Sequence, residues 1–125
     1  MGKLIYLKLS YKIVGILYDS YNKLGYGYQE KYYQRAVEQL LQDQNISYEK
    51  ELYCPIYLNK KRIGFYKLDF FIDRKIVLEL KVSQDFYKQQ LLQVLSYLKH
   101  KNIDLGILAI YTKSGLKYKR ITKGN

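Results

Sequence analysis

The sequence predicts an α/β fold in which helices flank a mixed β-sheet. Two stretches near the start carry apolar residues at spacings of three and four, the period of an amphipathic helix. From residue 46 the pattern changes to short runs rich in Tyr, Phe and Ile, which are typical of strands. A third helical stretch separates three such runs from two more. Because a helix between two strands favours a parallel pair, we expect parallel and antiparallel neighbours in one sheet.

The first two expected elements are helices over residues 9–24 and 29–44. Gly25 and Gly27 separate them, since glycine tolerates the positive φ at which helices commonly end. Each stretch places one apolar stripe on a single helix face. The stripes are Ile13, Val14, Leu17, Tyr21 and Leu24 in the first helix, and Tyr33, Ala36, Val37, Leu40 and Leu41 in the second.

The remaining elements are expected to be three strands, a helix and two strands. The first three strands cover residues 47–58, 63–72 and 76–82, with turns at residues 59–62 and 73–75. The helix covers residues 85–101, and the last strands cover residues 105–112 and 116–121. The predicted order is therefore α-α-β-β-β-α-β-β.

Length and composition exclude several classes of protein. At 125 residues the chain is expected to form one domain, residues 1–125, around a single core. A hydrophobic content of 48% excludes a disordered polycation. One cysteine and one histidine cannot build a disulfide framework or a Cys/His zinc site, and they favour a reducing, cytoplasmic compartment. The uncharged stretches at residues 13–18 and 105–112 are too short to cross a bilayer, so no membrane partner is expected.

The net charge of +11 favours a polyanionic partner. Eighteen of the 22 basic residues are lysine, and an A- and T-rich genome would enrich lysine whatever the function. The distribution is more informative, because residues 113–125 contain five bases and no acid. Such a segment favours a polyanionic partner through the release of counterions, and nucleic acid is the expected one. The candidate contacts in it are Lys113, Lys117, Lys119 and Arg120.

Two carboxylates are expected to face each other across a hairpin. If residues 73–75 close an antiparallel turn, Asp69 lies directly opposite Glu79, and Lys81 shares their face. Opposed carboxylates repel unless a cation lies between them, and hard Mg²⁺ prefers oxygen ligands. Alternatively, Lys67 and Lys81 neutralise the acids in an ordinary surface ladder. The other face carries an apolar set suited to a core, namely Leu68, Phe70, Ile76, Leu78 and Leu80.

Polar residues on two helices are further candidates. Glu30 begins the buried stripe of the second helix rather than its exposed face. An acid in a first helical turn also complements the helix dipole, which is the simpler explanation. On the third helix Gln90, Gln93 and Tyr97 form a polar stripe, which in most helices is merely solvated.

Taken together, these residues resemble a known family. The spacing Gly27-x-x-Glu30-x-x-Tyr33 is similar to the signature of the GxxExxY proteins, a branch of the PD-(D/E)XK nuclease superfamily. The similarity continues through residues 67–70, 77–81 and 93–99, and extends over about residues 9–122. It implies a restriction-endonuclease-like core. One departure from the family pattern is that Tyr21 and Gln90 stand where histidines are expected.

The resemblance also implies roles for individual residues. Asp69 and Glu79, with the Leu80 carbonyl, would hold Mg²⁺ or Mn²⁺, and Lys81 would be the catalytic lysine. Glu30 would face the same site and take part in metal binding, and Gln93 would be the polar catalytic residue of the third helix. Tyr33 and Tyr97 are expected to lie near the site and contact nucleic acid.

The sequence therefore predicts a small metal-dependent nuclease that hydrolyses nucleic-acid phosphodiesters, with DNA as the expected substrate. The alternative is a basic nucleic-acid-binding or accessory protein on the same fold with little or no cleavage. An interaction module within a larger assembly is a third interpretation. Cutting two strands in concert would require two copies, so a homodimer is compatible with the nuclease interpretation.

Overall fold

The computed structural model describes residues 5–124, so Asn125 at the end of the basic segment lies outside it. Over this range the predicted element order is confirmed. The helices are α1 (Leu7–Leu24), α2 (Glu30–Asp43) and α3 (Lys88–Lys101). The strands are β1 (Tyr48–Leu58), β2 (Lys61–Ile72), β3 (Ile76–Val82), β4 (Leu105–Thr112) and β5 (Gly115–Thr122).

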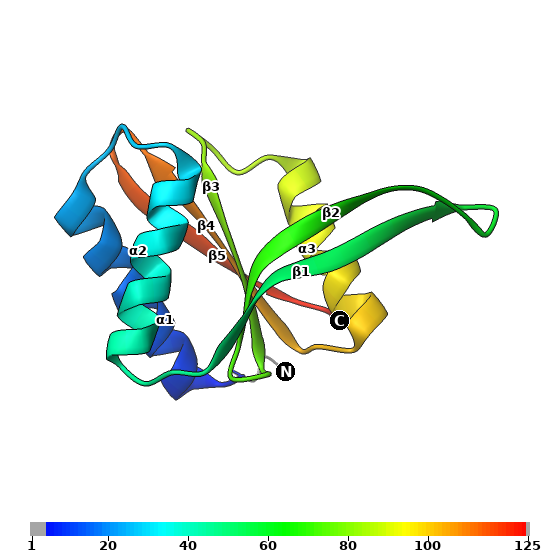
Figure 1. The fold of residues 1–125 in the computed structure, drawn as a ribbon, viewed down its shortest axis with the longest axis horizontal. Helices are drawn as coiled ribbons and strands as arrows, with labels where there is room; N and C mark the ends of the chain where they lie inside the picture. The colour runs from blue at the N-terminus through cyan, green and yellow to red at the C-terminus, as the bar shows by residue number, and fades with distance from the viewer. Residues whose placement is uncertain (1–4, 125) are drawn as a thin grey trace.

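The five strands form one mixed sheet in the order β1-β2-β3-β4-β5 (Figure 1). All neighbours are antiparallel except β3 and β4, which are parallel and are connected through α3. The predicted parallel pair is thus confirmed. The parallel pair lies inside the sheet, and every residue of β4 is buried, as expected for a strand covered on both faces.

The helices pack on opposite faces of the sheet and make two separate apolar clusters. In the larger cluster, α1 and α2 pack on one face of the sheet through residues such as Ile13, Tyr33 and Val37. In the smaller cluster, α3 packs on the other face through Val94 and Leu98. The larger cluster also contains Phe70, Leu78, Leu80, Ile107, Ala109 and Tyr111.

The hairpin of β1 and β2 projects beyond the rest of the sheet as an arm (Figure 1). Its turn is shorter than expected, because Asn59 and Lys60 adopt φ values of 49° and 68°. Two successive positive φ values make a two-residue type I′ turn, the geometry that matches the twist of paired strands. Strand β2 consequently begins at Lys61 rather than at residue 63.

Helix α3 begins at Lys88, three residues later than expected. Tyr87 is its N-cap residue, and the Tyr87 backbone N–H donates to Oε1 of Gln90 at 3.0 Å. Gln90 therefore has a structural role at this helix end. None of the helices over residues 5–124 is long and apolar enough to cross a membrane.

Candidate active site

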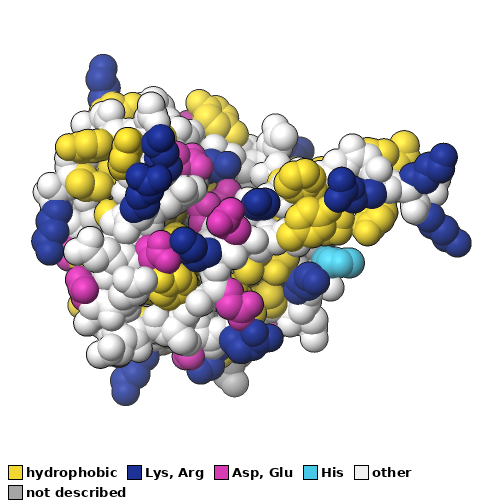
Figure 2. Space-filling view, in the orientation of Figure 1, with side chains coloured by type: hydrophobic (Ala, Val, Ile, Leu, Met, Phe, Trp, Pro, Cys, Tyr) yellow, Lys and Arg dark blue, Asp and Glu magenta, His cyan; other side chains and the backbone are white. Residues whose placement is uncertain are grey.

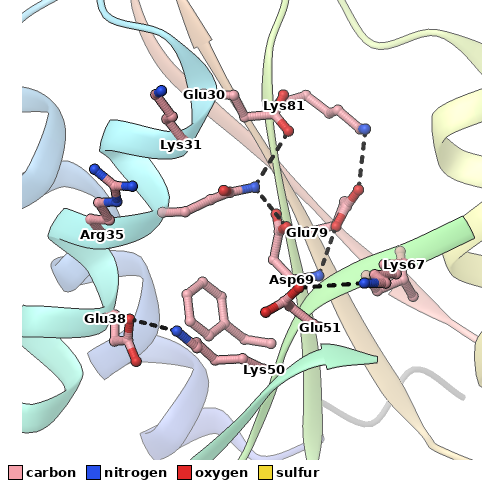
Figure 3. Close-up of a pocket in the computed structure, with 13 residues that line it drawn as sticks. Glu30, Lys31, Arg35, Glu38, Lys50, Glu51, Lys67, Asp69, Glu79 and Lys81 are labelled. Carbon is pink, nitrogen blue, oxygen red and sulfur yellow. Dashed lines mark hydrogen bonds and ion pairs between the residues drawn. The ribbon is translucent and has the colours of Figure 1, made fainter. Parts of the chain in front are cut away.

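A pocket of about 440 Å³ lies where α2 faces the diverging strands β2 and β3 (Figure 3). Helix α2 contributes Glu30 and Gln34, and β3 contributes Glu79 and Lys81. Strand β2 contributes Asp69. The structure thus brings together four of the predicted site residues, namely Glu30, Asp69, Glu79 and Lys81. The pocket is further lined by Lys31, Arg35, Glu38, Lys50, Glu51, Lys67, Leu68 and Phe70.

The two strands stop pairing immediately before the two acids. The predicted register is correct as far as Phe70, which pairs with Leu78. Asp69 and Glu79 were expected to be the next ladder pair, but they do not pair. Their side chains replace the missing backbone bonds. Oδ2 of Asp69 accepts from the Leu80 N–H at 2.8 Å, and Oε1 of Glu79 accepts from the Asp69 N–H at 3.0 Å. Each carboxylate is therefore positioned by the backbone of the opposite strand.

The pairing of β2 with β1 is interrupted at the same residue. Lys50 pairs with Phe70 and Leu52 pairs with Leu68, but the intervening Glu51 has φ 55° and makes no pair. Leu68 then packs in the α3 cluster while Phe70 packs in the α1–α2 cluster. The expectation that Leu68 and Phe70 share a face was wrong, because β2 twists sharply at Asp69.

Burial makes the two acids unfavourable as a charged pair. Glu79 is only 3% exposed, and its pKa is raised by burial and by the neighbouring charge of Asp69. The pKa of Asp69 is also raised, chiefly by burial, although its bond from the Leu80 N–H opposes the shift. A cation placed between them would relieve both the repulsion and the lost hydration.

Lys81 supplies one such charge. Its Nζ lies 3.3 Å from Oε2 of Glu79, and its side chain is partly exposed to the pocket. Burial by itself would lower the pKa of Lys81, but the charges of Glu79 and Glu30 outweigh it and raise the pKa. The ammonium group of Lys81 is thus paired with Glu79 and is still partly exposed to the pocket.

Gln34 is a site residue that the sequence reasoning missed. Its Nε2 donates to Oδ1 of Asp69 at 2.8 Å and to Oε2 of Glu30 at 3.4 Å. The other oxygen of Glu30 accepts from the Val82 N–H at 3.4 Å. The available signal was its position one helical turn after Glu30, which places both side chains on the same face.

Tyr33 positions the start of α2 rather than contacting nucleic acid. It is fully buried, its hydroxyl donates to the Gly25 carbonyl at 2.6 Å, and its ring stacks on Tyr111 with centroids 4.0 Å apart. Gly27 in the same loop has φ 119°, which favours glycine. The motif therefore consists of a turn glycine, a site acid and an aromatic anchor, and the full burial of Tyr33 leaves no exposed face for the predicted nucleic-acid contact.

Two predicted residues of α3 do not reach the pocket. Gln93 does not line it, and its backbone carbonyl accepts from the Tyr66 hydroxyl at 3.0 Å. Tyr97 is buried with Leu98 in the α3 cluster, so it is not exposed for contact with nucleic acid. The physical reason is that α3 and α2 pack on opposite sheet faces.

The basic carboxyl-terminal segment also lies away from the pocket. Its residues belong to β5, the sheet edge opposite β1, and Lys117 and Lys119 are exposed there. Arg120 was predicted to contact nucleic acid. Its guanidinium instead donates to the Ser10 hydroxyl and to the Ile5 carbonyl, and so ties β5 to the start of α1. Lys113 is exposed on the turn before β5. Within the pocket itself, five bases are balanced by five acids.

The donor set fits a hard divalent cation in type. Asp69, Glu79 and Glu30 offer carboxylate oxygens, the ligands that Mg²⁺ prefers. Because a strand residue's N–H and C=O point to the same side, the Leu80 carbonyl faces the gap into which its N–H donates. In the part of the chain that the structure describes, no three acidic, histidine or cysteine side chains converge closely enough to hold an ion as they stand.

An acid on one strand, a Glu-x-Lys on the next and flanking helices define a restriction-endonuclease-like fold. The family model of the PD-(D/E)XK nuclease superfamily matches residues 7–121, and the chain belongs to this superfamily. The narrower resemblance to the GxxExxY proteins stays a prediction. No curated protein matches the chain. Among solved structures, the crystal structure of SSO0001 is similar, with a TM-score of 0.49 and 17% identity over 95% of this chain and 79% of that one.

Proposed function

We propose that this protein is a metal-dependent nuclease that hydrolyses phosphodiester bonds in DNA. The observation that carries the proposal is the pair of acids at the end of the β2–β3 ladder, with Lys81 bound to one of them in an open pocket. Membership in a nuclease superfamily supports the reaction class. Buried like charges are costly to maintain for structure alone.

The metal in this proposal is Mg²⁺ or Mn²⁺. Asp69 and Glu79 would hold it with the Leu80 carbonyl. Glu30 would take part as well, since Nε2 of Gln34 contacts both Glu30 and Asp69. When bound, the cation supplies positive charge that stabilises the charge developing on the phosphate. Gln34 keeps the Asp69 carboxylate oriented, as supporting residues of metal ligands commonly do.

Lys81 is the residue proposed to act on the reacting groups. Its ammonium projects into the pocket beside Glu79, where it donates to the attacking water or to a phosphate oxygen. Lys31 and Arg35 are exposed on α2 at the same pocket and provide phosphate contacts. The substrate is positioned by these bases rather than by the β5 segment.

One observation favours the alternative of a binding protein without cleavage. The site carboxylates are already occupied by Gln34, Lys81 and backbone N–H groups, and they do not converge on a common point over residues 5–124. A chain that kept this arrangement would bind nucleic acid through its bases and leave it intact. The two functions differ in whether adding divalent metal leads to cleavage of the bound nucleic acid.

The test is incubation of the purified protein with plasmid and single-stranded DNA, with Mg²⁺, Mn²⁺ or chelator. Asp69→Asn and Lys81→Ala are compared with wild type, and Lys88→Ala, an exposed lysine at the start of α3, is the matched control. Cleavage is expected from wild type and Lys88→Ala only, and only with metal.

Two outcomes would contradict the proposal. If wild type and both site variants bind DNA equally and leave it intact, the binding-protein function is favoured. If Asp69→Asn cleaves as fast as wild type, the reaction does not use this site.

A further inference from the structure

Two aromatic side chains form an exposed pair on the projecting arm. Tyr53 is 43% and Phe65 is 50% exposed, and their ring centroids are 5.2 Å apart with an interplanar angle of 31°. The Arg62 guanidinium lies over both rings, 5.9 Å from the centroid of Tyr53 and 5.6 Å from that of Phe65. It also donates to the Tyr53 hydroxyl. We call Tyr53, Phe65 and Arg62 the aromatic platform.

Phe65 and Arg62 of the aromatic platform lie on β2, the strand that carries Asp69, and Tyr53 lies on the neighbouring β1. Along β2, Tyr66 and Leu68 pack towards α3, so the alternating Phe65 and Lys67 point to the opposite side. Lys67 lines the acid pocket together with Asp69, and it pairs across the ladder with Tyr53. A row of side chains therefore leads from the pocket to the platform.

The charge of the arm is one-sided. Residues 52–66 include three bases, Lys60, Lys61 and Arg62, and no acid. Figure 2 shows basic and hydrophobic side chains along the arm, next to the acids at the centre of the molecule. This combination of cations and partly exposed aromatic rings matches the phosphates and bases of a nucleic-acid strand, whose bases stack on aromatic rings.

The distance suits one continuous strand. Phe65 lies four residue steps before Asp69, which is about 13 Å at roughly 3.3 Å per residue. At about 3.4 Å per stacked nucleotide, this corresponds to about four nucleotides, or fewer when the strand is stretched. A strand whose phosphate lies at the acids can thus place a neighbouring base at the platform.

We propose that the aromatic platform stacks an unpaired base of the substrate strand, a few nucleotides from the phosphate that is cut at Asp69. The inference rests on the proposed nuclease function and adds a substrate class, namely single-stranded DNA or an unpaired region. A base can stack on an aromatic ring only when it is not already stacked between its neighbours. The bases of a continuous duplex are stacked in this way, so we do not expect them to bind the platform.

The chain has no tryptophan, which allows a direct test. In Phe65→Trp the new indole is the sole tryptophan, and a 12-nucleotide single-stranded oligothymidine in chelator is expected to quench its fluorescence. A blunt duplex of equal length is expected to quench it much less. Affinity for the single strand should fall about tenfold in Phe65→Leu, which keeps an apolar side chain without the ring, and should be retained in Phe65→Trp.

The matched control is Tyr11→Ala, which removes an aromatic side chain that is 80% exposed on α1. It is expected to bind as wild type does. Tyr53→Ala repeats the test on the other ring, and circular dichroism of each variant establishes that it is folded.

The outcomes separate the two proposals. Unchanged affinity in folded Phe65→Leu and Tyr53→Ala, with cleavage intact in wild type, overturns the platform and leaves the nuclease function standing. Equal quenching by duplex and single strand overturns the unpaired-base class. Quenching and a tenfold loss of affinity without any cleavage by wild type support the platform and overturn the nuclease function.

Discussion

Gln34 and Asp69 are joined by a hydrogen bond of 2.8 Å, from the amide Nε2 of one to Oδ1 of the other. The bond connects α2 with β2 across the pocket and fixes the acid from the side opposite to the Leu80 N–H. We expect Gln34→Ala to lower the rate of cleavage about tenfold or more while the protein stays folded, since loss of a supporting partner misplaces a metal ligand. Steady-state kinetics at several Mg²⁺ concentrations measure the effect.

The control is Gln39→Ala, an exposed glutamine of the same helix. It should leave the rate unchanged. If both variants cleave as wild type does, Gln34 has no role in orienting Asp69.

Divalent metal is expected to stabilise the protein. The acids at Asp69 and Glu79 repel each other and are poorly hydrated, so an ion that binds only the folded state raises its free energy of unfolding. At a concentration of 100 times the Kd the gain is about 2.7 kcal/mol. Thermal unfolding with and without Mg²⁺ measures it, and the gain should disappear in Asp69→Asn. An equal gain in that variant would show that the ion binds elsewhere.

Tyr33→Phe tests how the start of α2 is held. The substitution keeps the ring on Tyr111 but leaves the Gly25 carbonyl without its donor. We expect unfolding to become easier by about 1 kcal/mol, as for the loss of one hydrogen bond. Cleavage should fall as well, because Glu30 begins the helix that this bond anchors. Denaturant unfolding of the variant provides the measurement, and an unchanged midpoint would contradict the anchoring role.

Cys54 should be nearly inert to thiol reagents in the folded protein. Burial raises the pKa of its thiol from about 9 to about 11. The raised pKa lowers the thiolate fraction at pH 8, and with it the alkylation rate, about a hundredfold. Iodoacetamide labelling in native buffer and in denaturant compares the two states. Fast labelling in native buffer would mean that β1 opens readily from α3.

Periodicity was sufficient to predict the element order, because the helices bury stripes of apolar residues spaced by three and four and the strands are short runs rich in Tyr, Phe and Ile. The grouping of Asp69, Glu79 and Lys81 was predictable for a related reason. A short turn fixes the register of the hairpin, and the register determines which side chains are neighbours. The break of the β1–β2 ladder beside Asp69 was not predictable, since it lies at Glu51, a residue of a different strand with φ 55°.

Two of the predicted aromatic contacts, Tyr33 and Tyr97, lie buried because of the chemistry of tyrosine. Its ring is apolar and its hydroxyl is polar, so the same residue can pack in a core or contact nucleic acid. Tyr33 and Tyr97 pack, whereas Tyr53, which stands in an ordinary strand pattern, is exposed. Only the path of the arm beyond the sheet distinguishes them, and that path is a property of the tertiary structure.

The break in pairing at Asp69 has a consequence for how the site is assembled. Strand β2 has no ladder partner at this residue on either side. Asp69 is held instead by the Gln34 amide of α2, by the Glu79 carboxylate and by the Leu80 N–H of β3. The carboxylate therefore takes up its place only when α2, β2 and β3 have come together, so the site and the tertiary fold form in one step.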